Sequence, residues 1–112
     1  MHKLSDDEIP KLSYGDAGLV SLNWRVDGAE PTFIVTLNRL EWGVQRTITL
    51  AFTWPYVDIE LNSRYGFEPF SWQSGDDSDC QRLEDGRWKL TLDFAHQGAI
   101  YITCNDVYRE VV

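Results

Sequence analysis

The sequence predicts a mainly β protein: one antiparallel domain of six to seven strands, built as a meander, a sandwich or a roll, with a short N-terminal arm or helical turn. Apolar residues alternate with polar or small ones in at least five segments, most clearly over residues 48–54 and 88–94. Such alternation is typical of strands, because successive side chains point to opposite faces. No long stretch of helical periodicity separates these segments. The length of 112 residues fits a single domain, residues 1–112, with one core.

The N-terminal segment predicts little helix. Residues 5–8 (Ser-Asp-Asp-Glu) have the form of a capping box, which favours the start of a helix. Pro10 limits the length of that helix, since proline disrupts a helix interior. We therefore expect a single helical turn or a loose arm, followed by a loop around residues 14–16.

Three strands are predicted between residues 20 and 53. The first covers residues 20–26, where Leu22 and Trp24 alternate with polar residues, and the turn dipeptide Asp27-Gly28 leads toward a second strand over residues 33–37. Residues 38–43 break the alternation, so we expect a loop or a bulge there. The third strand follows over residues 45–53.

The apolar positions change parity at residues 54–56 (Trp-Pro-Tyr), because the next apolar set is Val57, Ile59 and Leu61. Proline cannot donate to a β ladder, which places residue 55 at a strand end or an edge. We expect a tight turn that begins a fourth strand, with one long bent strand as the alternative. Asp58 and Glu60 then face outward.

The C-terminal part predicts a long irregular segment followed by a hairpin. Residues 62–79 contain two glycines, a proline and several acidic residues, and long irregular segments in compact domains tend to be functional or mobile. Asp85-Gly86 turns the chain into a strand over residues 88–94, and residues 96–98 turn it into a strand over residues 100–104. The tail, residues 107–112, predicts a further short edge strand.

The inward positions of these strands predict one core. Its members are Leu22, Trp24, Leu50, Phe52, Leu90, Leu92, Phe94, Ile100 and Ile102. Trp54 and Trp88 have the same inward parity, so we expect both in the core. Cys104 continues the face of the last core strand, which predicts a buried thiol.

The chain is acidic, with 18 Asp and Glu against 10 Lys and Arg and a net charge of −8. A negative surface repels phosphate groups, which disfavours nucleic acid and anionic membranes as partners and favours a protein with a basic surface. No apolar run approaches the length of a membrane helix, and residues 1–8 lack the apolar core of a signal peptide. We therefore expect a cytoplasmic protein.

The potentially reactive side chains predict no catalytic site, no metal and no cofactor. Catalysis and metal binding need several nucleophilic, basic or ligating groups held together. His2 is near the end of the sequence, His96 is in a predicted turn, and Cys80 and Cys104 have no CxxC spacing. The acidic run at residues 76–79 lacks the glycine and the glutamate of a calcium loop. We expect a protein that is not an enzyme.

Five residues form the candidate partner-binding site: Trp42, Trp72, Asp76, Asp77 and Asp79. The two tryptophans fit a strand face less cleanly than the others, and exposed aromatic residues anchor many interfaces. The three aspartates concentrate negative charge close to Trp72, which would steer a basic partner toward it.

Three motifs occur in a particular order along the chain: Gly15-Asp16-Ala17 followed by Leu19 and Trp24, then Leu50-Ala51-Phe52, then Ile100-x-Ile102-x-Cys104. This order resembles that of a family of small bacterial immunity proteins found beside polymorphic toxins, whose strands follow a short arm and a histidine-aspartate-alanine step. Gly15 stands where the family has the histidine. The resemblance implies stoichiometric inhibition of a toxin domain, without catalysis.

Three function classes follow from the sequence. The first, which we favour, is a small acidic protein-binding domain that blocks a toxin or another basic partner. The second is a structural or oligomeric domain, for example a homodimer. The third is a carbohydrate- or small-ligand-binding β module that uses Trp42 and Trp72.

Overall fold

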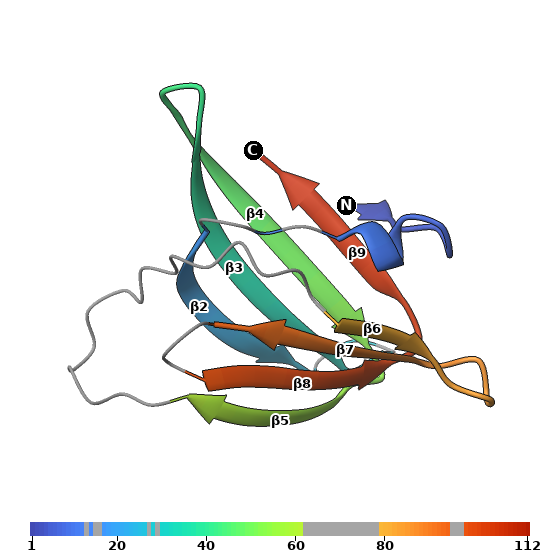
Figure 1. Ribbon diagram of the computed structural model, residues 1–112. Coiled ribbons are helices and arrows are strands. Elements are labelled where there is room, and N and C mark those ends of the chain that lie inside the picture. The colour runs from blue at the N-terminus through green and yellow to red at the C-terminus, as the bar shows by residue number, and fades with distance from the viewer. Residues whose placement is uncertain (13, 15–16, 27, 29, 62–78, 95–97) are drawn as a thin grey trace.

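The computed structural model describes residues 1–12, 14, 17–26, 28, 30–61, 79–94 and 98–112. Within these residues nine strands form two antiparallel sheets packed over a shared core (Figure 1). The five-stranded sheet has the order β1 (His2–Lys3), β9 (Val107–Val111), β4 (Val44–Thr53), β3 (Thr32–Glu41) and β2 (Gly18–Arg25). The four-stranded sheet has the order β5 (Tyr56–Leu61), β8 (Gly98–Cys104), β7 (Trp88–Asp93) and β6 (Asp79–Arg82). The predicted mainly β, antiparallel class is confirmed, and its architecture is a two-sheet sandwich.

All seven segments in which the sequence predicts a strand are strands. The two further strands, β1 and β6, have two and four residues, too few to show an alternation of their own. β1 pairs with β9 through His2↔Arg109 and Lys3↔Tyr108. The tail strand β9, predicted to lie at an edge, is therefore inside the sheet, between β1 and β4.

The chain crosses between the sheets at two corners, which are hydrogen-bonded to each other. β4 ends at Thr53 and β5 begins in the other sheet at Tyr56, while β8 passes into β9 through Asn105 and Asp106. The Thr53 N–H donates to the Asp106 carbonyl at 3.0 Å, and the Asn105 N–H donates to the Thr53 carbonyl at 3.0 Å. The Asp106 N–H also donates to the Thr53 hydroxyl at 3.0 Å.

The first corner explains the change of parity in the sequence. Trp54 has φ 48°, so a single residue in the left-handed region turns the chain between β4 and β5. The structure thus has the predicted tight turn and two separate strands, not one long bent strand. Each strand keeps its own inward set, which is even-numbered before the corner and odd-numbered after it.

The core lies between the inner faces of the two sheets. Its largest fully buried side chains are Tyr14, Phe33, Phe52, Phe94, Leu37, Leu50, Leu90, Leu92, Ile100, Ile102, Val35 and Val107. Of the predicted core, Leu50, Phe52 and the C-terminal members are buried, and Leu22 is half-buried and packs against the same cluster. Trp88 and Cys104 are buried as predicted.

The prediction that Trp24 and Trp54 lie in the core is wrong. Trp24 is 54% exposed and Trp54 is 48% exposed. Trp24 has the inward parity and its ring lies 4.9 Å from that of Phe33, but it is near the end of the edge strand β2. Trp54 is at the corner itself. Alternation gives the face of a side chain correctly, but it does not show how far the opposite sheet extends over that face.

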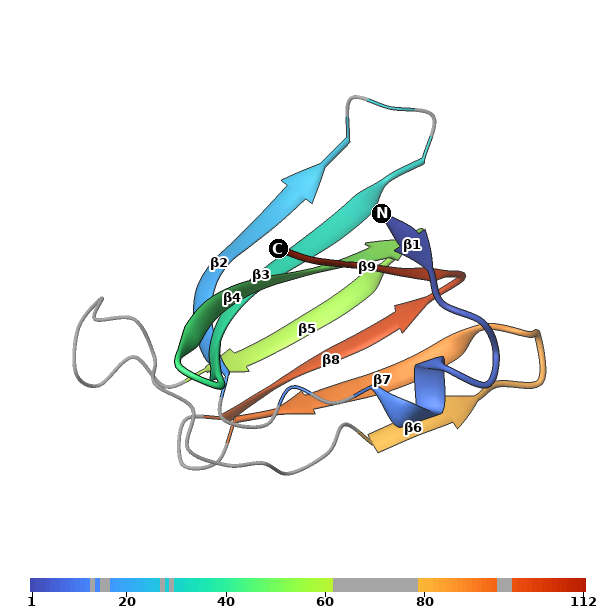
Figure 2. The ribbon, with the colours of Figure 1, turned by 90° about the horizontal axis from the view of Figure 1, so that it is seen from above.

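The N-terminal arm is part of the core. Leu4, Ile9, Leu12 and Tyr14 are all buried, and the single helical turn η1 (Ile9–Lys11) packs beside β6. Figure 2 shows the arm running from β1, at the edge of one sheet, to η1 beside the other sheet. The Tyr14 hydroxyl accepts a hydrogen bond from the backbone N–H of Asp93 at 2.7 Å. The arm therefore covers one open side of the sandwich.

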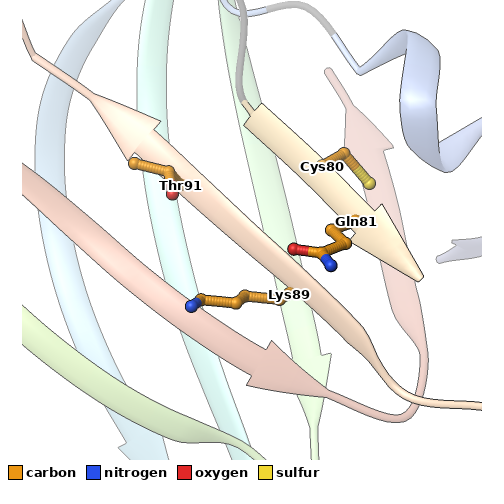
Figure 3. A pocket seen from close by; sticks show the side chains of 4 residues that line it. All are labelled: Cys80, Gln81, Lys89 and Thr91. Atoms are coloured by element: carbon orange, nitrogen blue, oxygen red, sulfur yellow. The ribbon is translucent and has the colours of Figure 1, made fainter. Parts of the chain in front are cut away.

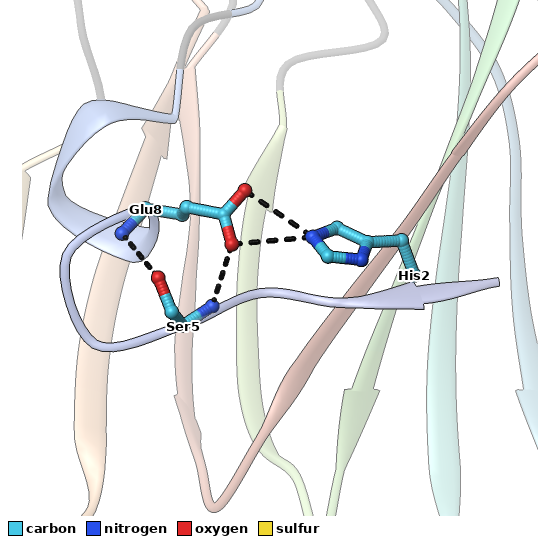
Figure 4. A network of polar contacts seen from close by, with 3 residues as sticks. All are labelled: His2, Ser5 and Glu8. Carbon is cyan, nitrogen blue, oxygen red and sulfur yellow. Dashed lines mark hydrogen bonds and ion pairs between the residues drawn. The ribbon is translucent and has the colours of Figure 1, made fainter.

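The hydrogen bonds of the predicted capping box are present at residues 5–8, in the turn just before η1, whose own N-cap residue Glu8 makes no side-chain capping bond (Figure 4). The Glu8 N–H donates to Ser5 Oγ at 3.2 Å, and the Ser5 N–H donates to Glu8 Oε1 at 3.0 Å. His2 Nε2 lies 3.1 Å from the same Glu8 oxygen. The backbone hydrogen bond from Ser5, followed by the contact with His2, lowers the pKa of the exposed Glu8 carboxyl below its ordinary value. No helix among the described residues is long and apolar enough to cross a membrane.

We predict that the Thr53 hydroxyl stabilises the corner by accepting the hydrogen bond from the Asp106 N–H. Thr53→Val keeps the shape of this buried side chain but leaves the Asp106 N–H without its acceptor, so the free energy of unfolding should fall by about 1–3 kcal/mol. Thr53→Ser keeps the acceptor and should lose less. Denaturant titration of both variants measures the difference. Equal losses would contradict the prediction, because they would show that the methyl group contributes as much as the hydroxyl at this corner.

We predict that Glu8 makes stability depend on pH on the acid side. Because its folded-state pKa is lowered, the ionised form stabilises the fold above the unfolded-state pKa, and this stabilisation is lost as the pH falls through the folded-state value. Glu8→Gln should therefore flatten the acid limb of a plot of unfolding free energy against pH. Ser5→Ala is the control, because it removes only Oγ and keeps the backbone bond that dominates the shift. Superimposable acid limbs for wild type and Glu8→Gln would contradict the prediction.

Candidate functional site

The hairpin of β3 and β4 is the longest one in the described part of the chain. Its ladder runs without interruption from Thr32↔Thr53 to Glu41↔Val44. The loop or bulge predicted at residues 38–43 is therefore wrong, because β3 continues to Glu41. Figure 1 shows this end of the hairpin projecting beyond the rest of the sandwich. The inward-facing side chains at this end extend beyond the opposite sheet, so they have no apolar face to pack against. This explains why the alternation of apolar residues stops there.

Trp42 and Gly43 form the two-residue turn of this hairpin. Both have positive φ values, 52° and 78°, as a type I′ turn requires. Glycine adopts this conformation readily, and asparagine is the residue that most often precedes it in such turns. A bulky side chain in the left-handed region is strained. The sequence thus places a large indole at a position where the backbone disfavours it.

The Trp42 side chain is fully exposed to solvent. Leu40 is 67% exposed and Val44 is 49% exposed, one on each face of the hairpin. We call Leu40, Trp42 and Val44 the hairpin tip. Exposed apolar side chains are common singly, but here three of them lie at one projecting end, at the turn and on both faces of the hairpin, where the described residues leave them exposed.

The charges behind the tip are partly neutralised. Arg39 and Arg46 are directly opposite each other in the ladder, and like charges in this arrangement repel. Glu41, two residues along on the same face, forms an ion pair with Arg39, whose Nε donates to Glu41 Oε1 at 2.8 Å. The two arginines and one glutamate leave a local charge of +1, on a chain whose net charge is −8.

The structure places two of the five predicted partner-binding residues. Trp42 is at the hairpin tip, and the backbone of Asp79 begins β6, where it pairs with Thr91. The two positions belong to different sheets. Trp72, Asp76 and Asp77 lie outside the described residues, so the grouping of all five into one site stays a prediction.

A second surface, which the sequence interpretation missed, lies on the outer face of the four-stranded sheet. A hollow of about 380 Å³ is lined there by Tyr56, Asp58, Glu60, Lys89, Tyr101 and Thr103. A neighbouring hollow of about 360 Å³ is lined by Cys80, Gln81, Lys89 and Thr91 (Figure 3). Asp58 and Glu60 face outward as predicted. The signal that could have revealed the rest was the outward parity of Tyr56 and Tyr101.

Among the described residues the cysteines and histidines form no cluster, although Cys80 lines the second hollow. Both cysteines are free thiols, and burial raises the pKa of Cys80 and raises that of Cys104 to about 12, so both stay protonated at neutral pH. His2 contacts Glu8 in the arm, and His96 lies outside the described residues. Within the part of the chain that the structure describes, no three His, Cys, Asp or Glu residues could jointly hold a metal ion.

Comparison with protein-family models, with curated proteins and with solved structures gives no match for this chain.

We predict that the Trp42 indole does not stabilise the fold. Trp42→Asn creates the favoured Asn-Gly turn and should raise the free energy of unfolding by about 1 kcal/mol. Trp42→Ala removes the indole but keeps the unfavourable backbone, so it should change stability by less than about 0.5 kcal/mol. Gly43→Ala, which meets no atom within 4 Å, should lose about 1 kcal/mol through backbone strain alone. A large loss of stability in both Trp42 variants would mean that the indole packs on the domain.

Proposed function

We propose that this chain is a protein-binding domain whose main contact is the hairpin tip, and that it binds and blocks a partner protein with a basic surface. The observation that carries the proposal is the Trp42 indole, fully exposed on a turn residue with φ 52°. Such strain persists only where something other than local backbone energy retains the residue. Among the described residues this tryptophan is fully exposed, so burial against a partner is the interaction that would offset the backbone strain.

The surroundings of Trp42 support an interface anchor. Tryptophan is among the residues that contribute most to binding free energy, typically at the centre of a contact from which water is excluded. Leu40 and Val44 extend the apolar area on both faces of the hairpin. The long ladder and the Arg39–Glu41 ion pair hold the tip in one conformation, which lowers the entropy lost on binding.

The net charge of the whole chain, unlike the local charge of +1 behind the tip, supports a basic partner. A net charge of −8 attracts a positively charged protein over several ångströms and speeds its approach, whereas the apolar tip acts only at contact. Charge and tip therefore have separate effects, on association and dissociation respectively. Stoichiometric inhibition of a toxin domain, as the resemblance to immunity proteins implies, and a cytoplasmic location both fit this proposal.

We predict that a photo-crosslinking amino acid at position 42 links the protein to its partner in living cells, and that the same amino acid at position 54 does not. Trp54 is the matched position, because it is also an exposed tryptophan with positive φ. It lies at the corner between the sheets, away from the hairpin tip. The protein identified by the crosslink is then purified and titrated with the variants.

In the titration, Trp42→Asn should weaken binding at least about tenfold, equivalent to about 1.4 kcal/mol, mainly through faster dissociation. Trp54→Asn should bind like the wild type, and added salt should slow association of both. Unchanged affinity of Trp42→Asn would refute the hairpin tip as the contact. A crosslink to a second copy of this chain would instead favour the oligomeric alternative.

A further inference from the structure

The outer face of the four-stranded sheet brings together side chains that are far apart in the sequence. The register pairs Tyr56 with Thr103 and Asp58 with Tyr101 across β5 and β8. It pairs Lys89 with Thr103 across β7 and β8. Outward-facing side chains in adjacent rows of neighbouring strands are within reach of one another when they are long. The two tyrosines, the acids of β5 and Lys89 therefore surround one spot.

From this juxtaposition we propose that the outer face binds a neutral, hydroxyl-rich ligand, an oligosaccharide, at a site separate from the hairpin tip. The hollow of about 380 Å³ is within the range of roughly 300–1,000 Å³ that is usual for small-ligand sites. It is open to solvent, as suits a ligand that keeps part of its own surface hydrated.

The tyrosines supply the flat surfaces that a sugar ring needs. Tyr56 is 74% exposed and Tyr101 is half-buried, so both rings are accessible from the same side. The C–H groups on one face of a pyranose carry partial positive charge and pack well on the electron-rich face of an aromatic ring. Each phenol hydroxyl also donates and accepts hydrogen bonds.

The charged residues decide between ligand classes. Asp58 and Glu60 only accept hydrogen bonds when ionised, and Lys89 only donates them. An anionic ligand would be repelled by the two carboxylates, and Lys89 opposes a cationic ligand only in part, because the three side chains together carry a net charge of −1. Hydroxyl groups both donate and accept, so a polyhydroxylated neutral ligand satisfies all three. Within the described residues, none of the three side chains takes part in an ion pair.

The extent of the surface favours a chain of sugars over a single one. The second hollow shares Lys89 with the first and continues to Gln81 on β6 and Thr91 on β7 (Figure 3). Together the two hollows reach across all four strands, about 14 Å at the usual strand spacing. Gln81 and Thr91 add further groups that donate and accept hydrogen bonds.

The test is isothermal titration of the whole chain with a panel of neutral hexasaccharides: maltohexaose, cellohexaose, xylohexaose and hexa-N-acetylchitohexaose. At least one should bind, with an affinity that does not change with ionic strength, because a neutral ligand is not screened. Tyr56→Ala, Asp58→Asn and Lys89→Gln should each weaken that binding about tenfold or more. Tyr108→Ala, which changes a tyrosine on the other sheet, is the matched control and should bind like the wild type.

The competing ligand class is a basic peptide. An oligolysine peptide that binds in a salt-dependent manner and binds more tightly to Lys89→Gln would overturn the proposal, since removal of Lys89 helps only a cation. Failure of all four sugars, or sugar binding that is indifferent to the three substitutions, would also overturn it. Thermal unfolding verifies that each variant is folded, and amide chemical-shift changes on the wild type must map to β5, β7 and β8. None of these results depends on Trp42, so this proposal and the protein-binding proposal can fail separately.

Discussion

The hydrogen bonds between Thr53 and the Asn105–Asp106 corner hold the two sheets in the arrangement on which the rest of the molecule depends. The chain passes between the sheets here, from β4 to β5 and from β8 to β9. β4 pairs with β9 in the five-stranded sheet, and β5 pairs with β8 in the four-stranded sheet. A slip of one residue at either crossing would turn an inward apolar set outward. The shared core therefore requires that the two corners stay in register, and the three bonds at 3.0 Å fix that register.

Much of the fold could be predicted from the sequence, because alternation reports directly which strands are half-buried. It located seven strands and the parity change at Trp54. It could not reveal β1 and β6, which are strands only because β9 and β7 are their partners. Alternation also assigned Trp24 to the core, because it identifies the inward face of a strand but does not show where the opposite sheet stops covering that face. The local pattern gives the positions of strands. Which strands lie at a sheet edge, and which side chains the opposite sheet buries, depend on the tertiary arrangement.

Of the two candidate surfaces, one could be predicted from the sequence and the other could not. Trp42 stood out in the sequence because it did not fit a strand face, and the structure gives the reason, a turn residue with positive φ. Tyr56 and Tyr101 fit their strands well and so attracted no notice, although the register of β5 with β8 brings them onto one face. Residues that depart from a pattern can be identified locally. Residues that obey it become a site only through non-local pairing.

The pairing of β1 with β9 has a consequence for the order of assembly during synthesis. β9 is translated well after β4, yet it lies between β4 and β1 and contributes the fully buried Val107. Until β9 leaves the ribosome, β4 carries a long unpaired edge and β1 has no partner. Exposed edges of this kind recruit foreign strands. The β4 edge of the nascent chain therefore stays open to such pairing until β9 emerges and covers it.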